Sequence, residues 1–127
     1  MSYTIQKMRA KIHNGIVTRA NLDYDGSVTI GKALLQFSGI EEWERVQVLN
    51  ITNGKRIETY VIAGKEREIE LNGAAARFFN KGDRVIIIAY ATVTRSGDPN
   101  EVPKDGFTRV RVILNGAEDN LIKEILD

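Results

Sequence analysis

The sequence predicts a mainly β protein that folds as a compact β-barrel with a few short helices. Short segments in which polar and apolar residues alternate dominate the chain, and helical periodicity is sparse. Many short strands with few helices favour a barrel over a layered α/β sheet. The chain has 127 residues, of which 43% are hydrophobic, and this is enough to bury the core of one domain. We therefore expect residues 1–127 to form a single β-barrel domain.

The clearest strand pair is a hairpin over residues 45–63. Arg45–Ile51 alternates polar and apolar residues, as a half-buried strand does, and Ile57–Ile62 resumes the pattern. Between them, the dipeptide Asn53-Gly54 is a strong hairpin signal because both residues tolerate a positive φ. The pattern predicts two antiparallel strands joined by this turn.

Further strands are predicted on both sides of the hairpin. Ile16–Val17 and Val28–Ile30 bracket a turn, and Glu66–Leu71 is another short strand. Val85–Thr94 is rich in β-branched residues and almost continuously apolar, which indicates a strand buried on both faces. Phe107–Leu114 alternates again and predicts a last strand.

Helical signals are few and short. Lys32–Phe37 predicts about two turns that end at Gly39, a residue suited to a left-handed cap. Ala74–Phe79 predicts a shorter helix. Ala117–Leu126 carries four aliphatic residues at helical spacing behind two acidic ones, which predicts a C-terminal helix. Arg95–Gly106 holds both prolines and is expected to be an exposed connector.

Composition excludes several classes of function. With 18 basic and 17 acidic residues the net charge is only +1, which argues against a nucleic-acid module. The chain has no cysteine and a single histidine, so disulfides, thiolate catalysis and a multi-His metal centre are excluded, and we expect no metal. We expect His13 to be structural or to support a neighbouring residue. The longest apolar run, Val85–Ala91, is too short to cross a bilayer, and the N-terminus lacks a secretory apolar region. We expect a cytoplasmic protein without membrane contact.

The tetrapeptide from Tyr24 to Ser27 has two explanations. Asp25-Gly26 is a common turn dipeptide, and serine often follows it. Alternatively, the Ser27 hydroxyl attacks the carbonyl of Gly26, whose missing Cβ leaves room for the attack. The resulting ester can eliminate to dehydroalanine and hydrolyse to a pyruvoyl ketone, which accepts an amine as a Schiff base. The chain lacks the size and phosphate-binding loop expected of a pyridoxal-phosphate enzyme, so such a ketone would supply the electron sink.

Other polar residues have ordinary structural explanations when taken singly. Lys11 and Arg56 flank β segments and are typical solvated charges, although together they suit two carboxylates. Tyr60 lies within a strand, where it would pack, although its phenol can also donate a proton. Asn72 precedes an unusually small stretch, Gly73–Ala76, and suits a helix N-cap, although backbone N–H groups there can also approach a carboxylate.

Order and spacing of these motifs are more specific than any one of them. From about residue 8 to about residue 94 the chain closely resembles the aspartate 1-decarboxylases, pyruvoyl-dependent enzymes that make β-alanine for pantothenate. The resemblance rests on Lys11-Ile12-His13, Val17-Thr18, Ala20 to Ile30, Asn53-Gly54-Lys55-Arg56, Thr59-Tyr60, Asn72 to Ala76 and Gly82-Asp83.

The resemblance implies a double-ψ β-barrel that assembles as a homotetramer. It implies self-cleavage between Gly26 and Ser27 into residues 1–26 and 27–127, with Ser27 becoming the pyruvoyl group. Ser27 would then form the Schiff base with L-aspartate, and Tyr60 would protonate the carbanion left by loss of CO₂.

The resemblance also assigns the remaining site residues. Thr59 would assist self-cleavage and contact substrate, Lys11 and Arg56 would bind carboxylates, and Asn72 would hold the pyruvoyl end. Further substrate contacts would come from Gly73, Ala74 and Ala75.

Two other functions stay open at this stage. A non-enzymatic β-barrel binding module would keep the fold and leave the Gly26–Ser27 bond uncut. A DNA-binding swapped hairpin would need a clustered basic stripe, and the net charge of +1 disfavours it.

Overall fold

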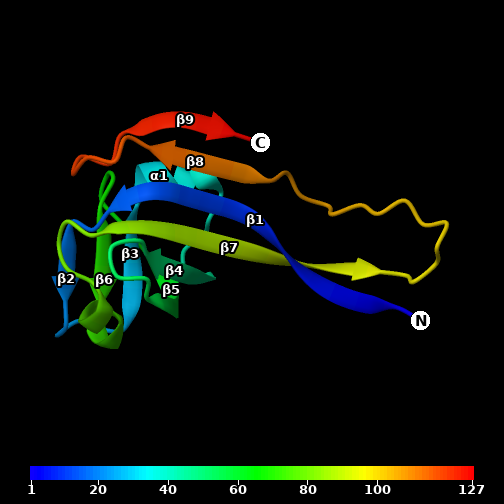
Figure 1. Cartoon of the computed structure of the whole chain (residues 1–127), viewed down its shortest axis with the longest axis horizontal. Coiled ribbons are helices and arrows are strands. Elements are labelled where there is room, and N and C mark those ends of the chain that lie inside the picture. Colours follow the sequence, from blue (N-terminus) through cyan, green and yellow to red (C-terminus); the bar gives the residue numbers. More distant parts are fainter.

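The computed structural model describes all 127 residues and confirms a mainly β fold with two short helices (Figure 1). The strands are β1 (Tyr3–Ile16), β2 (Arg19–Asn21), β3 (Ser27–Gly31), β4 (Arg45–Asn50), β5 (Arg56–Gly64), β6 (Ile69–Asn72), β7 (Arg84–Arg95), β8 (Val110–Leu114) and β9 (Ile122–Leu126). The helices are α1 (Lys32–Ser38) and a 3₁₀ helix, η1 (Gly73–Phe78). Neither helix has the length and apolar character needed to span a membrane.

All nine strands belong to one mixed sheet in the order β2-β6-β3-β5-β4-β7-β1-β8-β9. Strand β3 lies between a parallel neighbour, β5, and an antiparallel one, β6. The segment after β1 returns to β6, where the backbone N–H of Thr18 donates to Ile69 O at 2.8 Å. This sheet is consistent with the expected β-barrel, while the double-ψ connection remains an expectation.

The core is one cluster of nineteen buried hydrophobic residues contributed by the strands and both helices. Strand β4 buries alternate residues, such as Val46 and Val48, whereas β5 fully buries only Val61. Strand β3 differs because all five of its residues are buried. A polar residue in β3 must therefore find its partners inside the protein.

The predicted hairpin is confirmed, with β4 and β5 antiparallel from Arg45 opposite Tyr60 to Leu49 opposite Arg56. Its turn is longer than the dipeptide signal implied. Only Gly54 has a positive φ, of 79°, and its N–H donates to the carbonyl of Asn50 at 2.7 Å. Helix α1 also matches the sequence, and Gly39 follows it at φ 75°.

The longest ladder joins β1 to β7. The sequence predicts the strand at β7, but in the region of β1 it predicts only a short strand segment at Ile16–Val17. The two strands extend beyond the body of the protein as a ribbon, and the 95–106 connector projects with them (Figure 1). Asp105 anchors this connector by accepting hydrogen bonds from Arg95 at 2.8 Å and from Lys7 at 3.0 Å. These bonds hold the pKa of Asp105 at about 2, well below its usual range.

The expected C-terminal helix over Ala117–Leu126 is wrong. Its last residues form β9, which pairs antiparallel with β8. Asn120 prevents a continuous helix because its φ is 49°, in the left-handed region. The free edge of β8 then offers backbone hydrogen bonds that outweigh a weak helical pattern.

Three strand predictions need smaller corrections. Strand β7 is not buried on both faces, because its buried residues alternate with exposed or half-buried ones. The strand expected at Glu66–Leu71 begins only at Ile69, after a turn in which Glu66 has φ 50°. The strand expected at Phe107–Leu114 begins at Val110.

A buried asparagine ties the C-terminal segment to the barrel. The Asn120 side chain accepts from the N–H of Ile16 at 2.8 Å and donates to the Ile16 carbonyl at 3.0 Å. Its amide nitrogen also donates to the carbonyl of Arg67 at 3.1 Å. The Asn120 side chain thus satisfies the backbone N–H and carbonyl of Ile16, as a neighbouring strand would.

We expect Asn120→Gly to lower the free energy of unfolding by about 2 kcal/mol, because it keeps the backbone conformation but leaves buried polar groups unpaired. Asn115→Ala is the control, since Asn115 is an exposed asparagine of the same segment. Thermal denaturation compares both variants with the wild type, and a wild-type midpoint for Asn120→Gly would show that the Asn120 amide contributes nothing.

Candidate active site

The Gly26–Ser27 bond lies at a boundary between exposed and buried chain. Residues 22–26 form an exposed turn, and Ser27 begins β3 with no exposed surface. A Cβ built on Gly26 would meet no atom within 4 Å outside its two chain neighbours. In the direction of this Cβ, Gly26 is open, while Ser27 is held in the buried strand.

The Ser27 hydroxyl is held by two hydrogen bonds. It donates to the carbonyl of Asp25 at 2.9 Å and accepts from the amide nitrogen of Asn72 at 3.0 Å. The same Asn72 nitrogen donates to the Thr29 hydroxyl at 2.9 Å. This network is buried, so the orientation of the serine oxygen is well defined.

Asn72 does not act as the side-chain cap that its position suggested. It occupies the N-cap position of η1 but makes no side-chain capping hydrogen bond. The β3–β6 register places Asn72 opposite Ser27, so the two side chains lie on the same face of the sheet. Its side-chain amide therefore donates to the Ser27 hydroxyl and does not cap the helix.

Gly73 brings a second backbone segment against the candidate bond. Its φ is 65°, and a Cβ there would lie 2.7 Å from the N and Cα atoms of Gly26. The same Cβ would lie 2.8 Å from the carbonyl oxygen of Tyr24. Both the backbone conformation and the contact require glycine at this position.

A pocket of about 330 Å³ opens beside Gly26. It is lined by Gly26, Ile57, Glu58, Thr59, Ala74, Ala75 and Phe78. The structure thus brings Thr59, Ala74 and Ala75, three residues predicted to contact substrate, to the candidate bond. Glu58 and Phe78 also line this pocket and were not found from the sequence.

Tyr60 lies on the strand next to Ser27. Val61 pairs with Val28 in parallel register, so Tyr60 and Ser27 occupy equivalent positions just before the pair. Because Val28 and Val61 point into the core, the two preceding side chains point away from it. The Tyr60 ring stacks on Trp43, with centroids 5.7 Å apart and planes 22° from parallel.

Trp43 is a neighbour of the site that sequence analysis missed. It lies outside every strand, in the loop before β4. An isolated tryptophan in a loop of acidic residues carried no periodic signal that would have placed it against Tyr60.

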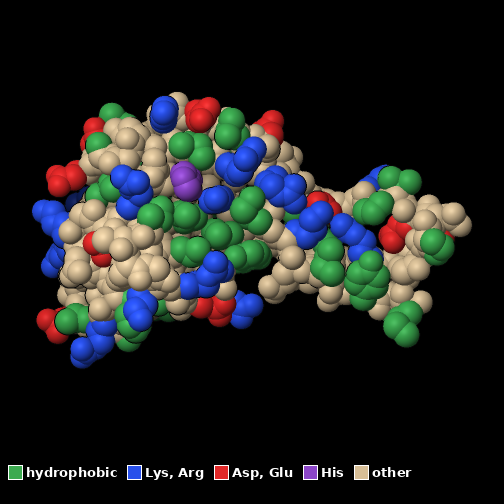
Figure 2. All heavy atoms as spheres, viewed as in Figure 1, with side chains coloured by type: hydrophobic (Ala, Val, Ile, Leu, Met, Phe, Trp, Pro, Cys, Tyr) green, Lys and Arg blue, Asp and Glu red, His purple; other side chains and the backbone are tan.

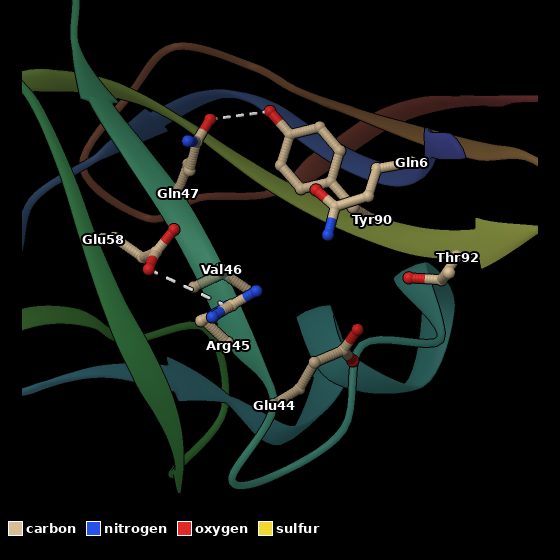
Figure 3. A pocket seen from close by; sticks show the side chains of 8 residues that line it. All are labelled: Gln6, Glu44, Arg45, Val46, Gln47, Glu58, Tyr90 and Thr92. Atoms are coloured by element: carbon tan, nitrogen blue, oxygen red, sulfur yellow. Dashed lines mark hydrogen bonds and ion pairs between the residues drawn. The ribbon is translucent and has the colours of Figure 1, made fainter. Parts of the chain in front are cut away.

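Arg56 is turned toward a different pocket. Its guanidinium donates to the side-chain oxygen of Gln47 at 2.8 Å, and the Tyr90 hydroxyl donates to the same oxygen at 2.7 Å. Gln47 belongs to a larger pocket, of about 490 Å³, lined by Gln6, Glu44, Arg45, Val46, Gln47, Glu58, Tyr90 and Thr92 (Figure 3). None of the predicted site residues lines it, so the smaller pocket beside Gly26 is the better candidate.

Lys11 lies on β1, and β5, β4 and β7 separate this strand from β3 in the sheet. Lys11 does not line the pocket beside Gly26. His13, two residues on, has a pKa lowered first by burial and then by the charges of Lys11 and Arg84. It is therefore neutral near pH 7, and its buried Nδ1 atom has no hydrogen-bond partner.

The sheet around Lys11 has an apolar outer face. Side chains that alternate with buried core residues remain half-exposed there, and they are Leu49, Ile86, Ile88 and Ile113. Figure 2 shows hydrophobic side chains over β1 and β7 with lysine and arginine around them. Apolar patches rimmed by polar groups are typical of protein interfaces.

Comparison with known proteins gives a consistent result. The model of the family described as aspartate decarboxylase matches residues 3–105. An aspartate 1-decarboxylase of Clostridium botulinum (strain Loch Maree / Type A3) is 55% identical over 93 residues, which are 72% of this chain and 73% of that protein. An aspartate 1-decarboxylase of Sulfurimonas denitrificans is 44% identical over 126 residues, 98% of each chain.

We expect Gly73→Ala to destabilise the protein more than Gly54→Ala. Both glycines have left-handed φ angles, so each substitution costs about 1–2 kcal/mol from backbone strain. Only at position 73 does the new methyl group also meet backbone atoms, since nothing lies within 4 Å at Gly54. Chemical denaturation compares the two variants, and equal losses of stability would contradict the close packing of Gly73 on Gly26.

Proposed function

The chain belongs to the aspartate decarboxylase family, and from this premise we propose that it converts L-aspartate to β-alanine and CO₂. The observation that carries the proposal is the Gly26–Ser27 junction, where the serine hydroxyl is held by Asn72 next to an open glycine. The β-alanine formed would serve pantothenate synthesis.

We propose that the enzyme makes its own pyruvoyl group from Ser27. The Ser27 oxygen attacks the Gly26 carbonyl carbon, the C–N bond between them breaks, and the proton passes from oxygen to nitrogen to give an ester. Loss of the residue-27 α-proton then expels the Gly26 carboxylate and leaves dehydroalanine. One water hydrolyses this residue to the ketone and releases one ammonia.

The surrounding residues fit this processing. The Asp25 carbonyl accepts the hydroxyl hydrogen, and Asn72 donates to the oxygen, so both orient the nucleophile. Thr59 lines the pocket against Gly26, where its hydroxyl would stabilise charge on the attacked carbonyl. Strand pairing with β5 and β6 would retain the new chain end after cleavage.

A pyruvoyl ketone at residue 27 would supply a carbonyl for the substrate amine and an electron sink for loss of the carboxylate. The residues of this chain bind and protonate. Ala74 and Ala75 line the pocket and Gly73 precedes them, and backbone N–H groups of this stretch would bind a substrate carboxylate. Tyr60, beside Ser27, would donate its phenolic proton to Cα and recover one from water.

Placement of the cations supports a site shared between copies. Lys11 lies on the outer face of β1, outside the pocket beside Gly26 and separated from β3 by three strands in the sheet, and an apolar patch surrounds it. A second copy packed by this face would bring its Lys11 to the first copy's pocket. We therefore propose that the active form is the homotetramer implied by the family resemblance.

Purified protein should separate into fragments of residues 1–26 and 27–127, with a ketone in place of the amine on the larger one. Ser27→Ala removes the nucleophile and should remain a single chain of unchanged length. Intact mass spectrometry after prolonged warming measures both. A wild-type chain that stays whole would favour the unprocessed binding module, and the decarboxylase proposal would fail.

We expect activity to return when two inactive variants are assembled together. Lys11→Ala retains a competent Ser27, and Ser27→Ala retains a competent Lys11, so a mixed assembly contains sites with both groups. Each variant alone should lose at least roughly 10²-fold in activity, as losses of positioned catalytic groups do. Subunits exchanged by mild denaturation and refolding are then assayed for β-alanine. Absence of recovery in verified mixed tetramers would contradict a shared site.

A further inference from the structure

Trp43 has a backbone conformation that its side chain does not favour. Its φ is 73°, in the left-handed region, where bulky residues are genuine outliers. Its side chain is also 68% exposed, so burial in the core does not explain the conformation. Strained residues that persist in this way cluster at functional sites.

The contact that Trp43 makes is the stack on Tyr60. The centroid separation of 5.7 Å and the angle of 22° fall within the range of favourable aromatic pairs. Strand β4 begins at Arg45, which lies opposite Tyr60, so the chain just before β4 covers this part of β5. Without Trp43, that face of the phenol ring would be open to solvent.

The loop that carries Trp43 is held by hydrogen bonds of Trp43 itself and of the residues before and after it. The N–H of Trp43 donates to the carbonyl of Val61 at 2.7 Å, and the N–H of Val61 donates to the carbonyl of Glu44 at 3.0 Å. Glu44 also accepts a hydrogen bond from Arg9 of β1 at 3.1 Å. The Glu42 carboxylate accepts from the N–H of Ala63 at 2.9 Å. These bonds make the loop a fixed platform on β5.

We propose that Trp43 is a positioning residue that holds the Tyr60 phenol in the orientation needed to protonate the substrate. This inference rests on the proposed function, in which the Tyr60 O–H bond breaks as a C–H bond forms at Cα. A proton donor must lie within hydrogen-bond reach of its acceptor, and a tyrosine on an open sheet face has several rotamers. The indole ring excludes those rotamers that would occupy its own space.

Three variants separate this role from a structural one. Trp43→Gly removes the ring and also relieves the strain, so we expect the melting temperature to be unchanged or higher while kcat falls by roughly tenfold. Trp43→Phe keeps an aromatic ring and should retain kcat within about twofold. Glu66→Gly is the matched control, because Glu66 is a second strained residue, at φ 50°, without an aromatic partner.

Two further measurements report on the contact itself. Trp43 is the only tryptophan, so its fluorescence directly reports the stack, and Tyr60→Leu should change the emission whether or not the enzyme is active. If protonation becomes slower, the solvent deuterium isotope effect on kcat should rise in Trp43→Gly and stay at the wild-type value in Glu66→Gly. Self-cleavage, followed by mass, should be complete in every variant.

The outcomes distinguish the inference from the function on which it rests. An active wild-type enzyme with normal kcat and isotope effect in Trp43→Gly would overturn the role of Trp43 alone. A fall in kcat that follows a fall in melting temperature would also overturn it, since the effect would then be structural. A processed Tyr60→Phe with normal kcat would remove Tyr60 as the proton donor and this inference with it, whereas a wild-type protein that makes no β-alanine would remove the proposed function itself.

Discussion

Complete burial of β3 between two neighbours of opposite direction is the constraint on which the rest of the structure depends. Five buried residues pair with β5 on one side and β6 on the other, so the strand can neither shift nor turn without breaking both ladders. Close backbone contacts tighten this arrangement at the far end of the strand. A Cβ on Gly31 would lie 2.0 Å from the carbonyl oxygen of Glu66, so the two segments meet with no room for a side chain. Ser27 is the first residue of this strand and inherits its rigidity.

In the proposed function, one chain completes the part of the site around Ser27, and a second copy supplies Lys11. Around Ser27 the chain supplies a neutral, buried hydrogen-bond network that orients a hydroxyl, and a small pocket beside Gly26. Neutral groups are suited to an acyl shift within the backbone, which needs geometry more than charge. Of the two cations that would hold a dicarboxylate, Arg56 donates to Gln47, and Lys11 lies beside an apolar patch on β1, which three strands separate from β3. This division is the physical reason for expecting the second part of the site to come from another copy.

Two residues with left-handed backbone conformations, Gly73 and Trp43, contact residues of the candidate site, and they differ in the cost of that conformation. At Gly73 the absence of a Cβ removes the cost and allows backbone to approach backbone. At Trp43 a large side chain keeps the cost, and the ring is placed on Tyr60. Glycine removes the cost of the left-handed backbone conformation at position 73. At position 43, beside the proposed proton donor, tryptophan keeps that cost. This contrast agrees with the proposed positioning role of Trp43.

Local patterns in the sequence determined the elements whose partners are close in the chain. The 45–63 hairpin, helix α1 with Gly39, and the small-residue turn after Asn72 were all predicted, because alternation, turn dipeptides and caps act over a few residues. The Gly26-Ser27 motif was also visible, since its chemistry depends on adjacent residues. Only the tertiary structure decided β9 and most of β1, because each is formed by pairing with a strand distant in sequence. It also decided that Asn72 binds Ser27, that Trp43 stacks on Tyr60, and that Lys11 lies four strands from the serine. These are facts of register and sheet order, and such long-range pairings leave no periodic trace in the sequence of either partner.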